Sequence, residues 1–437
     1  MTNKAEHALA WVATVDMGLG HGRAIFPFRD FAEQGIIAIN ESVHTAQEEK
    51  RLWRRLIRLY EFFSRSSSVP LIGKPLFFLL DMLQAIPDLD AKRNIAKPGM
   101  QVRLVKKGIE MGLSRGMLEK IVEKPLPLLT SYMTPAIAAD AARFERIFCI
   151  ICDAEVSRAW VPQNPQTSRI HYLVPCTRTV LRLKRYGVPE KHISLTGFPL
   201  PQELLGGEGL DTLRSDFFRR LLRLDPSGVF RRTHVQEIDG LLGGAHEKIN
   251  TPDVLRISYA VGGAGAQKEI GAQIAKSLST ELLKRTVELN LVSGVRAEVR
   301  DFFTKVKRKY APSCENLRIV YSSSKQEYFA DFSALMRKTD ILWTKPSELS
   351  FYCGLGLPLI LTPSLGAQER YNRKWLLHIN AAFPQKDPRL AHRWLFELQR
   401  NGGLAELAWN GFNKVEKRGT YNILNILRSV EKLLTEN

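Results

Sequence analysis

The chain has 437 residues, with 63 Lys and Arg against 45 Asp and Glu. This length predicts two domains of roughly 200 residues each. The excess of 18 positive charges favours anionic partners, such as phosphorylated substrates or acidic lipid surfaces. The excess is local, because residues 51–124 have 15 basic and 7 acidic side chains, whereas residues 1–50 have 4 and 7.

The five cysteines lie in or beside apolar runs, which predicts buried thiols in a reducing, cytoplasmic compartment. Cys149 and Cys152 have the spacing of a metal or redox pair, but they belong to a buried-strand pattern without a second such pair. Neither role is therefore expected. No secretory signal is predicted, and the most apolar stretch, residues 69–87, is too interrupted to span a membrane. Basic and aromatic residues alternate only within 50–65, so no nucleic-acid partner is expected.

In chain order, residues 8–15 predict a buried parallel strand that leads into a loop with Gly18, Gly20 and Gly22. These glycines allow backbone N–H groups to approach a ligand, and a helix is predicted to begin near residue 23 or 24. His21 lies in the same loop, where it is either a general base or substrate contact, or a capping or surface histidine. The loop lacks the other marks of a dinucleotide fingerprint, so a nicotinamide enzyme is not expected.

A basic helical insertion is predicted at about residues 50–135. Residues 50–65 place apolar and aromatic side chains at helical spacing, with five basic residues around them. Such a helix either lies on an anionic membrane surface or packs on the core with a solvated basic rim.

The α/β pattern returns with strands at 147–152 and 170–174 and a helix at 177–186. Asp153 ends the first of these strands at the carboxyl edge of the sheet. It either acts as a base, or orients an acceptor, or is a structural carboxylate that caps the following turn. Residues 201–253 are glycine-rich and predict an interdomain linker with an insertion, which closes a first domain of residues 1–200.

The second domain, residues 254–437, opens like the first, with a strand at 256–261 and a loop with Gly262, Gly263 and Gly265. Such a loop before a helix is a phosphate-type cradle. Further strands are predicted at 286–292 and 317–321, and a strand–helix–strand unit over 341–361. Ser347 is a predicted N-cap, whose helix would direct free N–H groups at an anion. Residues 375–437 are predicted to be mostly helical, with the last helix packed on the first domain.

Five segments, in order, resemble family 28 glycosyltransferases, which include the monogalactosyldiacylglycerol synthases and the lipid-II-forming N-acetylglucosaminyltransferase. They are DMGLGHGR, CDAEVSRAWVP, YLVPCTRTVLRLKRYGVPEKHISLTGFPLP, YAVGGAGAQ and DILWTKPSELSFYCGLGLPLILTPSLGAQERYN. The resemblance implies an α/β GT-B fold, in which two Rossmann-like domains with parallel sheets face a central cleft. The nucleotide sugar would bind the second domain, and the acceptor the first.

By position, the resemblance assigns His21 to the motif histidine near the acceptor, on the loop of Gly18, Gly20 and Gly22. The residues that it assigns to the donor site are Gly262, Gly263, Gly265, Gln267, Thr344, Lys345, Pro346, Gln368, Glu369 and Asn372. Ser347 joins this donor set as the predicted N-cap. The family's ribose-binding glutamate has no direct counterpart. If the position of that glutamate is counted back from the GLP at 356–358, Phe351 occupies it. If the position is counted forward from the motif that begins at Thr344, Glu348 is the nearest glutamate and lies one helical turn before it. Either Glu348 binds the ribose from a shifted helix start, or the nucleotide is bound differently.

The implied reaction is an inverting transfer from a UDP-sugar to an acceptor hydroxyl, with His21 or Asp153 as the base. The nucleotide sugar is a co-substrate, and no cofactor or metal is expected. The basic, apolar first domain predicts a lipid or amphiphilic acceptor and a peripheral location on the inner membrane face. Two alternatives remain open: a nucleotide-sugar 2-epimerase of the same fold, and a non-catalytic protein that binds a sugar nucleotide.

Overall fold

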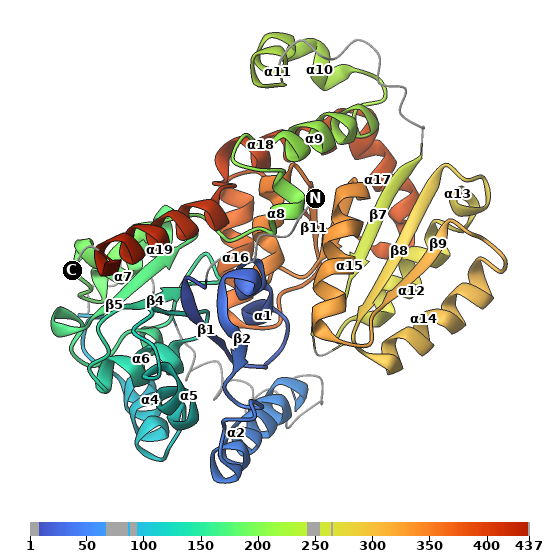
Figure 1. The fold of residues 1–437 in the computed structure, drawn as a ribbon. Coiled ribbons are helices and arrows are strands. Elements are labelled where there is room, and N and C mark those ends of the chain that lie inside the picture. The colour runs from blue at the N-terminus through green and yellow to red at the C-terminus, as the bar shows by residue number, and fades with distance from the viewer. Residues whose placement is uncertain (1–7, 67–85, 88–93, 243–253, 264, 436–437) are drawn as a thin grey trace. The chain divides into compact units, whose positions relative to one another are not determined.

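The computed structural model describes residues 8–66, 86–87, 94–242, 254–263 and 265–435. These residues form two compact units. Unit 1 contains the chain up to residue 199 together with 366–371 and 418 onward, and unit 2 contains residues 200–365 and 372–417. Each unit is built on a six-stranded sheet, and every strand pair that the structure describes is parallel (Figure 1). The predicted α/β class with two parallel sheets is confirmed.

In unit 1 the strand order is β2-β1-β3-β4-β5-β6. The middle strands are buried along their whole length, as expected where helices cover both faces of a parallel sheet. The strands are β1 (Ala10–Thr14), β2 (Ala32–Ala38), β3 (Leu128–Thr130), β4 (Ile147–Ile150), β5 (Ile170–Val174) and β6 (Ile193–Leu195). The helices are α1 (Gly20–Ile25), η1 (Phe26–Phe31), α2 (Gln47–Ser66), α4 (Met100–Glu110), α5 (Arg115–Ile121), α6 (Met133–Ala141), η2 (Arg158–Trp160), η3 (Pro165–Thr167), α7 (Thr177–Arg185), η4 (Glu190–His192) and α19 (Gly419–Thr435).

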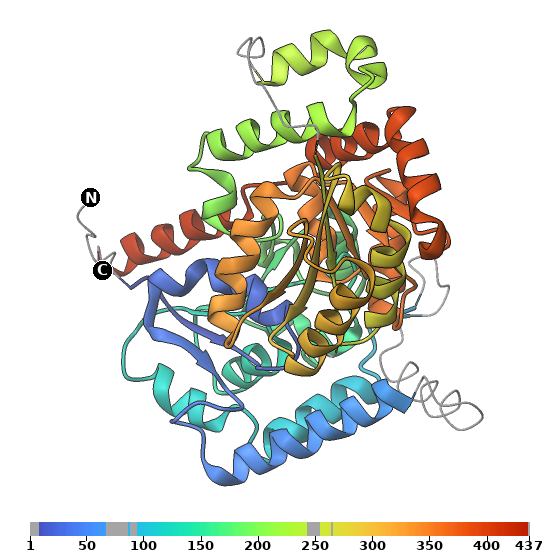
Figure 2. The ribbon, with the colours of Figure 1, turned by 90° about the vertical axis from the view of Figure 1, so that its right-hand side faces the viewer.

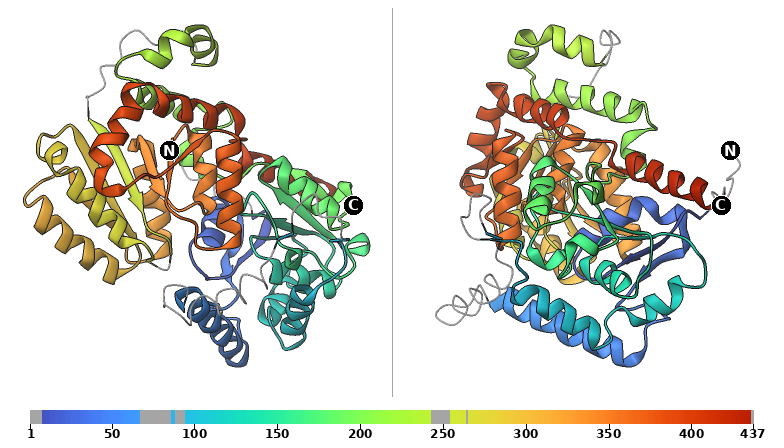
Figure 3. Two further views of the ribbon diagram at one scale, coloured as in Figure 1. Left: turned by 180° about the vertical axis from the view of Figure 1, so that it is seen from behind. Right: turned by 90° about the vertical axis from the view of Figure 1, so that its left-hand side faces the viewer.

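In unit 2 the strand order is β12-β11-β10-β7-β8-β9. The strands are β7 (Leu255–Ala260), β8 (Val287–Gly294), β9 (Leu317–Tyr321), β10 (Ile341–Thr344), β11 (Leu359–Leu361) and β12 (Ala382–Pro384). The helices are α8 (Gln202–Leu205), α9 (Asp211–Leu224), α10 (Val229–Thr233), α11 (Val235–Leu242), α12 (Lys268–Ser277), α13 (Ser279–Leu283), α14 (Ala297–Tyr310), α15 (Lys325–Lys338), η5 (Glu348–Leu355), η6 (Pro388–Leu390), α17 (Ala391–Arg400) and α18 (Gly403–Lys414). Helix α16 (Ala367–His378) is divided, because its residues up to 371 group with unit 1 and the rest with unit 2. Figure 3 shows α17 and α18 in red within this unit.

The sequence misses four strands, β2, β3, β6 and β12, the last of them in a stretch expected to be mostly helical. Three of the four have only three residues, which is too short for a periodic pattern to be read. The first helix, α1, begins at Gly20 instead of the predicted residue 23 or 24.

Helix α9 lies in the segment predicted as a linker with an insertion, and it groups with unit 2. Arg220 on this helix is buried, and its guanidinium donates to the carbonyl oxygens of Met336, Thr339 and Leu355 at 3.1, 2.7 and 2.6 Å. These carbonyls stand at the carboxyl ends of α15 and η5, where helices have unpaired acceptors and the negative end of the helix dipole. Burial lowers the pKa of Arg220 to about 10, so it stays charged at neutral pH. Residues 243–253 of the expected linker lie outside the described residues.

The last helix, α19, groups with unit 1. The Asn422 amide donates to the carbonyl oxygen of Thr196 at 2.8 Å. Gly419 lies so close to Phe198 that an added Cβ would stand 2.2 Å from the Phe198 carbonyl oxygen. A glycine is therefore required where this helix begins.

Helix α2 contains the basic stretch singled out in the sequence, and it is the long blue helix in Figure 2. Its first turn is fixed by the buried carboxylate of Glu49, which accepts hydrogen bonds from the N–H groups of Ser114 and Gly116 at 2.7 and 3.0 Å. Trp53 is also buried and donates to Glu49 at 3.3 Å. Within the described ranges, no helix is long and apolar enough to cross a bilayer.

We expect His171 to make the stability of unit 1 dependent on pH. It lies on β5, with Nε2 2.8 Å from Ser194 Oγ, and burial, followed by the nearby His192, lowers its pKa to about 4. The unfolded chain therefore binds more protons than the folded protein between pH 6.5 and 4, so the free energy of unfolding should fall as the pH falls through that window. We expect this group to contribute about 2 kcal/mol to the fall, after allowance for its partial exposure.

The measurement is urea unfolding at pH 6.5 and pH 4 of the wild type and of His171→Gln, which keeps a hydrogen-bonding side chain that does not titrate. The variant should lose less stability between the two pH values, because the other titrating groups are the same in both proteins. Equal losses would show that His171 is not the cause.

Candidate functional site

Each sheet contains one point where the strand order reverses. In unit 2 the chain runs outward from β7 through β8 and β9, and then returns to the opposite side at β10. In unit 1 the same reversal separates β1 from β3. In open parallel sheets, the loops at the carboxyl ends of such strands diverge and leave a crevice for a ligand. The candidate sites are therefore the loops after β7 and β10, and those after β1 and β3.

The glycine loop after β7 contacts the turn after β10. An added Cβ on Gly262 would lie 2.5 Å from Lys345 Cε and 3.1 Å from its Nζ, so the Lys345 side chain lies directly over this glycine. Gly265 has φ +73° and donates its N–H to the Gly262 carbonyl at 2.7 Å, which closes a tight turn. The resulting surface combines a glycine backbone with an ammonium group, which suits a phosphate oxygen.

A second cation, Arg296, fixes the same loop. It follows β8, and its Nε donates to the carbonyl oxygen of Gly263 at 2.9 Å. The sequence analysis did not single out Arg296. Its position just beyond the carboxyl end of a predicted strand was the available signal, but nothing in the local pattern distinguishes it from a surface arginine.

Gln267 joins the glycine loop to the loop after β11. Its side-chain amide donates to the Pro363 carbonyl at 2.9 Å, and its Oε1 accepts from Thr362 Oγ1 at 2.7 Å. Its backbone carbonyl accepts from the Tyr259 hydroxyl at 2.5 Å, and its φ is +67°. The side-chain amide is therefore engaged at both ends, which gives Gln267 a positioning role in the loop.

The turn after β10 is fixed from two sides. Thr344 is buried and donates to the Ala260 carbonyl at 3.3 Å, and the buried Asn372 amide donates to the Pro346 carbonyl at 3.1 Å. Ser347 stands at the N-cap of η5, but its side chain makes no capping hydrogen bond. The following helix is 3₁₀ in form and ends at Leu355, and its C-cap Gly356 has φ +68°.

Of the two residues considered for the ribose, Phe351 is wholly buried, with its ring 5.0 Å from that of Trp375. Glu348 is half-buried at the first position of η5. Phe351 is thus part of the core. Gln368 and Glu369 lie in the first turn of α16, within the residues 366–371 that group with unit 1, whereas Asn372 groups with unit 2.

In unit 1, His21 lies at the point where β1 and β3 diverge. Its Nδ1 is 2.9 Å from the carbonyl oxygen of Ser131, which follows β3. Because a carbonyl only accepts, this contact places the proton of the neutral ring on Nδ1 and leaves Nε2 basic. The ring is 4.8 Å from that of Tyr132 and 5.9 Å from that of Trp160. The fold thus holds one tautomer of His21 between aromatic side chains.

Of the three glycines around His21, only Gly18 has a backbone conformation that favours glycine. Gly18 has φ +71°, whereas Gly20 and Gly22 lie in α1. Cys152 Sγ is 3.7 Å from His21 Nδ1. The cysteines are free thiols, and burial raises the pKa of Cys149. Among the described residues, no three His, Cys, Asp or Glu side chains form a group that could hold a metal ion.

The acidic residues after β4 have different surroundings. Asp153 is half-buried, and its backbone carbonyl accepts from Thr179 Oγ1 at 3.4 Å. Glu155, which the sequence analysis did not single out, is buried and accepts from Arg182 Nε and Arg178 Nε, both at 2.8 Å. Arg182 is itself buried on α7. Glu155 therefore attaches the loop after β4 to that helix.

No protein-family model and no curated protein matches the sequence. Solved structures do match. MnaA of S. aureus, in a structure with UDP, is 11% identical, covers 98% of each chain and has a TM-score of 0.50. The chain has the GT-B fold. MurG of Acinetobacter baumannii is 12% identical over 97% of this chain and 99% of its own, with a TM-score of 0.46. UDP-GlcNAc 2-epimerase of Methanocaldococcus jannaschii, in complex with UDP-GlcNAc and UDP, is 10% identical over 98% of this chain and 99% of its own, with a TM-score of 0.41.

At these identities the likeness concerns the fold alone. The GT-B fold agrees with the two parallel sheets and with their reversal points, at which this architecture leaves room for a ligand.

Proposed function

We propose that the protein is a family 28-like glycosyltransferase, which transfers a sugar from a UDP-sugar to an acceptor hydroxyl with inversion. One observation carries the proposal: Lys345 lies over Gly262 at the reversal point of the second sheet, and Arg296 binds the same loop. Two cations beside a glycine backbone match the charge of a departing nucleoside diphosphate. The half-buried carboxylate of Glu348 would accept hydrogen bonds from the ribose hydroxyls.

In the proposed reaction the acceptor oxygen attacks the anomeric carbon, and its proton passes to Nε2 of His21. The bond between the anomeric carbon and the phosphate oxygen breaks, and the nucleoside diphosphate leaves with both electrons. The Ser131 carbonyl holds the His21 tautomer that can take this proton. Lys345 and the glycine-loop N–H groups stabilise the charge on the leaving group.

A 2-epimerase would need acidic residues and a histidine around the sugar nucleotide. From residue 247 to 377 the sequence contains no histidine. That range includes the loops after β7, β8, β9, β10 and β11, so the sheet edge proposed to bind the donor does not supply this histidine. An epimerase histidine would therefore have to come from another part of the chain, such as unit 1, which also supplies His21, so the reaction products distinguish the two enzymes.

The test combines binding with product analysis. Thermal shift against UDP-glucose, UDP-galactose and UDP-N-acetylglucosamine should reveal a donor that adds ~2.7 kcal/mol of stability at 100 times its Kd. The shift should be lost in Glu348→Gln and kept in Glu315→Gln, a control at an exposed carboxylate that precedes β9. When a panel of acceptors is then added with this donor, the correct acceptor should cause the enzyme to release UDP. A C2-epimerised sugar would identify an epimerase instead, and binding without product a non-catalytic sensor.

Gly262→Ala tests the contact with Lys345. The new Cβ would displace Cε of a flexible side chain, so the stability of the free protein should change by less than about 1 kcal/mol. Affinity for the donor should fall about tenfold or more, because a charge-assisted hydrogen bond is worth about 1.5–3 kcal/mol. Calorimetric titration measures this, with Gly240→Ala as the control, since an added Cβ there meets nothing within 4 Å. Unchanged affinity would exclude Lys345 from the donor site.

We also propose that the acceptor is a membrane lipid reached through α2. Arg51, Arg54, Arg55 and Arg58 are exposed on this helix, and Leu56 is 41% exposed among them. Each basic residue near an anionic surface adds about 1 kcal/mol of attraction. The double variant Arg54→Glu and Arg55→Glu should reduce sedimentation with phosphatidylserine vesicles by tenfold or more. Arg308→Glu with Lys309→Glu, exposed on α14, should not. Equal losses of sedimentation in the two double variants would show that vesicle binding depends only on the net charge of the protein.

A further inference from the structure

Five tryptophan side chains are buried among the described residues, and four of them donate their indole N–H group to an acceptor. A buried indole N–H usually has such a partner, because an unpaired polar group is costly to bury. The pairs are Trp11 and the Lys124 carbonyl at 3.2 Å, Trp53 and the Glu49 carboxylate at 3.3 Å, Trp343 and the Gln385 amide oxygen at 2.9 Å, and Trp394 and the Asp387 carbonyl at 3.0 Å. Trp160 is only 5% exposed, yet no described residue accepts a hydrogen bond from its indole N–H.

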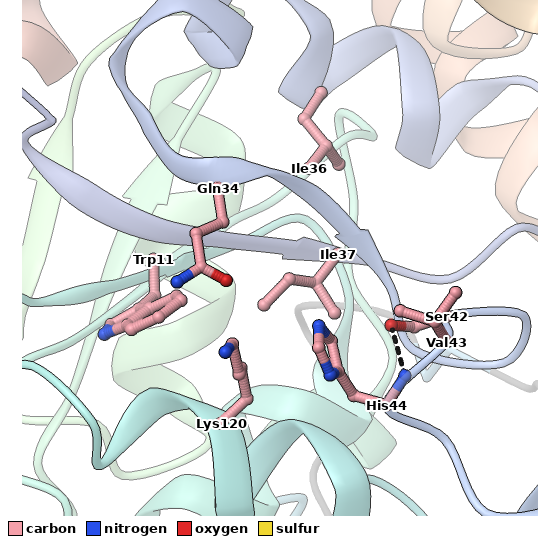
Figure 4. Close-up of a pocket in the computed structure, with 8 residues that line it drawn as sticks. All are labelled: Trp11, Gln34, Ile36, Ile37, Ser42, Val43, His44 and Lys120. Atoms are coloured by element: carbon pink, nitrogen blue, oxygen red, sulfur yellow. Dashed lines mark hydrogen bonds between the residues drawn. The ribbon is translucent and has the colours of Figure 1, made fainter.

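A cavity of about 180 Å³ in unit 1 shows the ordinary case. Trp11 and Lys120 are among the residues that line it (Figure 4). The indole N–H of Trp11 is taken by the Lys124 carbonyl, and the Lys120 amino group is paired with Glu123 at 2.6 Å. Both donors at this cavity are therefore already paired, whereas the N–H of Trp160 is not.

Trp160 lies beside the proposed base. The centroid of its ring is 5.9 Å from those of His21 and Tyr132, and these two centroids are 4.8 Å apart. The backbone of Trp160 is fixed, because its carbonyl accepts from the Tyr172 hydroxyl at 2.9 Å and its N–H donates to the Ser157 carbonyl at 3.2 Å. The indole with the unpaired donor is thus held next to the histidine that would take the proton of the acceptor.

We propose that the Trp160 indole N–H donates a hydrogen bond to the acceptor substrate, at an oxygen on the carbon next to the attacked hydroxyl. This inference rests on the proposed function. An indole N–H only donates, and a donor bound to the attacking oxygen itself would withdraw electron density from it. A second oxygen is therefore the better partner, and the closeness of the two rings places it on a neighbouring carbon. A glycerol head group and a sugar both have this arrangement, and a simple alcohol does not.

The experiment labels the seven tryptophans of the full-length protein with ¹⁵N and follows their indole N–H signals by NMR. The Trp160 signal is the one missing from Trp160→Phe. The probes are 1-hexanol, monohexanoylglycerol and hexyl glucoside, which share a six-carbon chain. The Trp160 signal should move downfield with monohexanoylglycerol or with hexyl glucoside, and the probe that moves it distinguishes a glycerol from a sugar acceptor. 1-Hexanol, which lacks the second oxygen, should leave that signal in place.

Trp160→Phe keeps an aromatic ring against His21 and Tyr132 but has no N–H group. It should bind the responding probe about three- to tenfold more weakly, which is the effect of losing one neutral hydrogen bond. Trp394→Phe is the matched control, since Trp394 is 6% exposed and its N–H is paired. The control should leave the affinity for the probe unchanged. It should lower the melting temperature more than Trp160→Phe does, because only the control breaks a hydrogen bond within the protein.

Unchanged affinity of Trp160→Phe for the responding probe would overturn the inference, as would a Trp160 signal that no probe moves. An equal movement with 1-hexanol would overturn the requirement for a second oxygen. Failure of the proposed function gives a different result, because probe binding needs no donor. A protein that binds a probe through Trp160 but never releases UDP from a UDP-sugar would keep this site and lose the transferase assignment.

Discussion

His21→Ala should lower kcat for sugar transfer by a factor of about 10² to 10⁴, the usual contribution of a positioned general base. The donor should still stabilise the variant in a thermal shift, because Lys345, Arg296 and Glu348, which are proposed to bind the nucleotide, are in unit 2. The remaining activity should no longer decline at the acidic pH where a histidine becomes protonated. These three measurements separate loss of the base from loss of donor binding.

His192→Ala is the matched control. This half-buried histidine of the same unit lies on η4, after α7, and its ring centroid is 6.3 Å from that of His171. It should keep nearly full activity. His21→Gln adds a further test, because its amide can still donate to the Ser131 carbonyl but cannot accept a proton. An active His21→Gln variant would assign His21 to positioning and leave Asp153 as the candidate base.

Arg220→Met should destabilise unit 2 by on the order of 5 kcal/mol. Methionine fills much of the same space, but it leaves the carbonyl groups of Met336, Thr339 and Leu355 without their donor. Each buried acceptor left unsatisfied costs about 1–3 kcal/mol. Urea unfolding measures the loss. We expect two transitions, in which the midpoint of unit 2 lies well below that of unit 1.

Arg219→Met is the control on the same helix. Its side chain is 42% exposed and pairs with Asp216, so its removal should cost less than about 1 kcal/mol. If both variants lose the same small amount, water satisfies the three carbonyls and the proposed anchoring of α9 is wrong. If neither folds, limited proteolysis of the wild type between residues 200 and 242 tests whether this segment is protected.

Local sequence determined much of the fold. Buried parallel strands such as β1 and β4 appear as largely apolar runs, and two strands followed by glycine loops predict phosphate-type sites. The β5 and β9 bounds agree with the predicted 170–174 and 317–321. These features are readable because each depends on residues that are adjacent in the chain.

Other features depend on pairs that are distant in sequence, and the tertiary structure alone decided them. Arg220 and Glu155 look like ordinary surface charges in a helix and a loop, yet each is buried because its partners come from elements far away in the chain. Lys345 and Gly262 meet because β10 pairs with β7 across the reversal of the sheet. The tautomer of His21 is set by a carbonyl 110 residues away. Composition and periodicity record which residues are apolar, but the burial of a charge depends on packing partners that neither of them specifies.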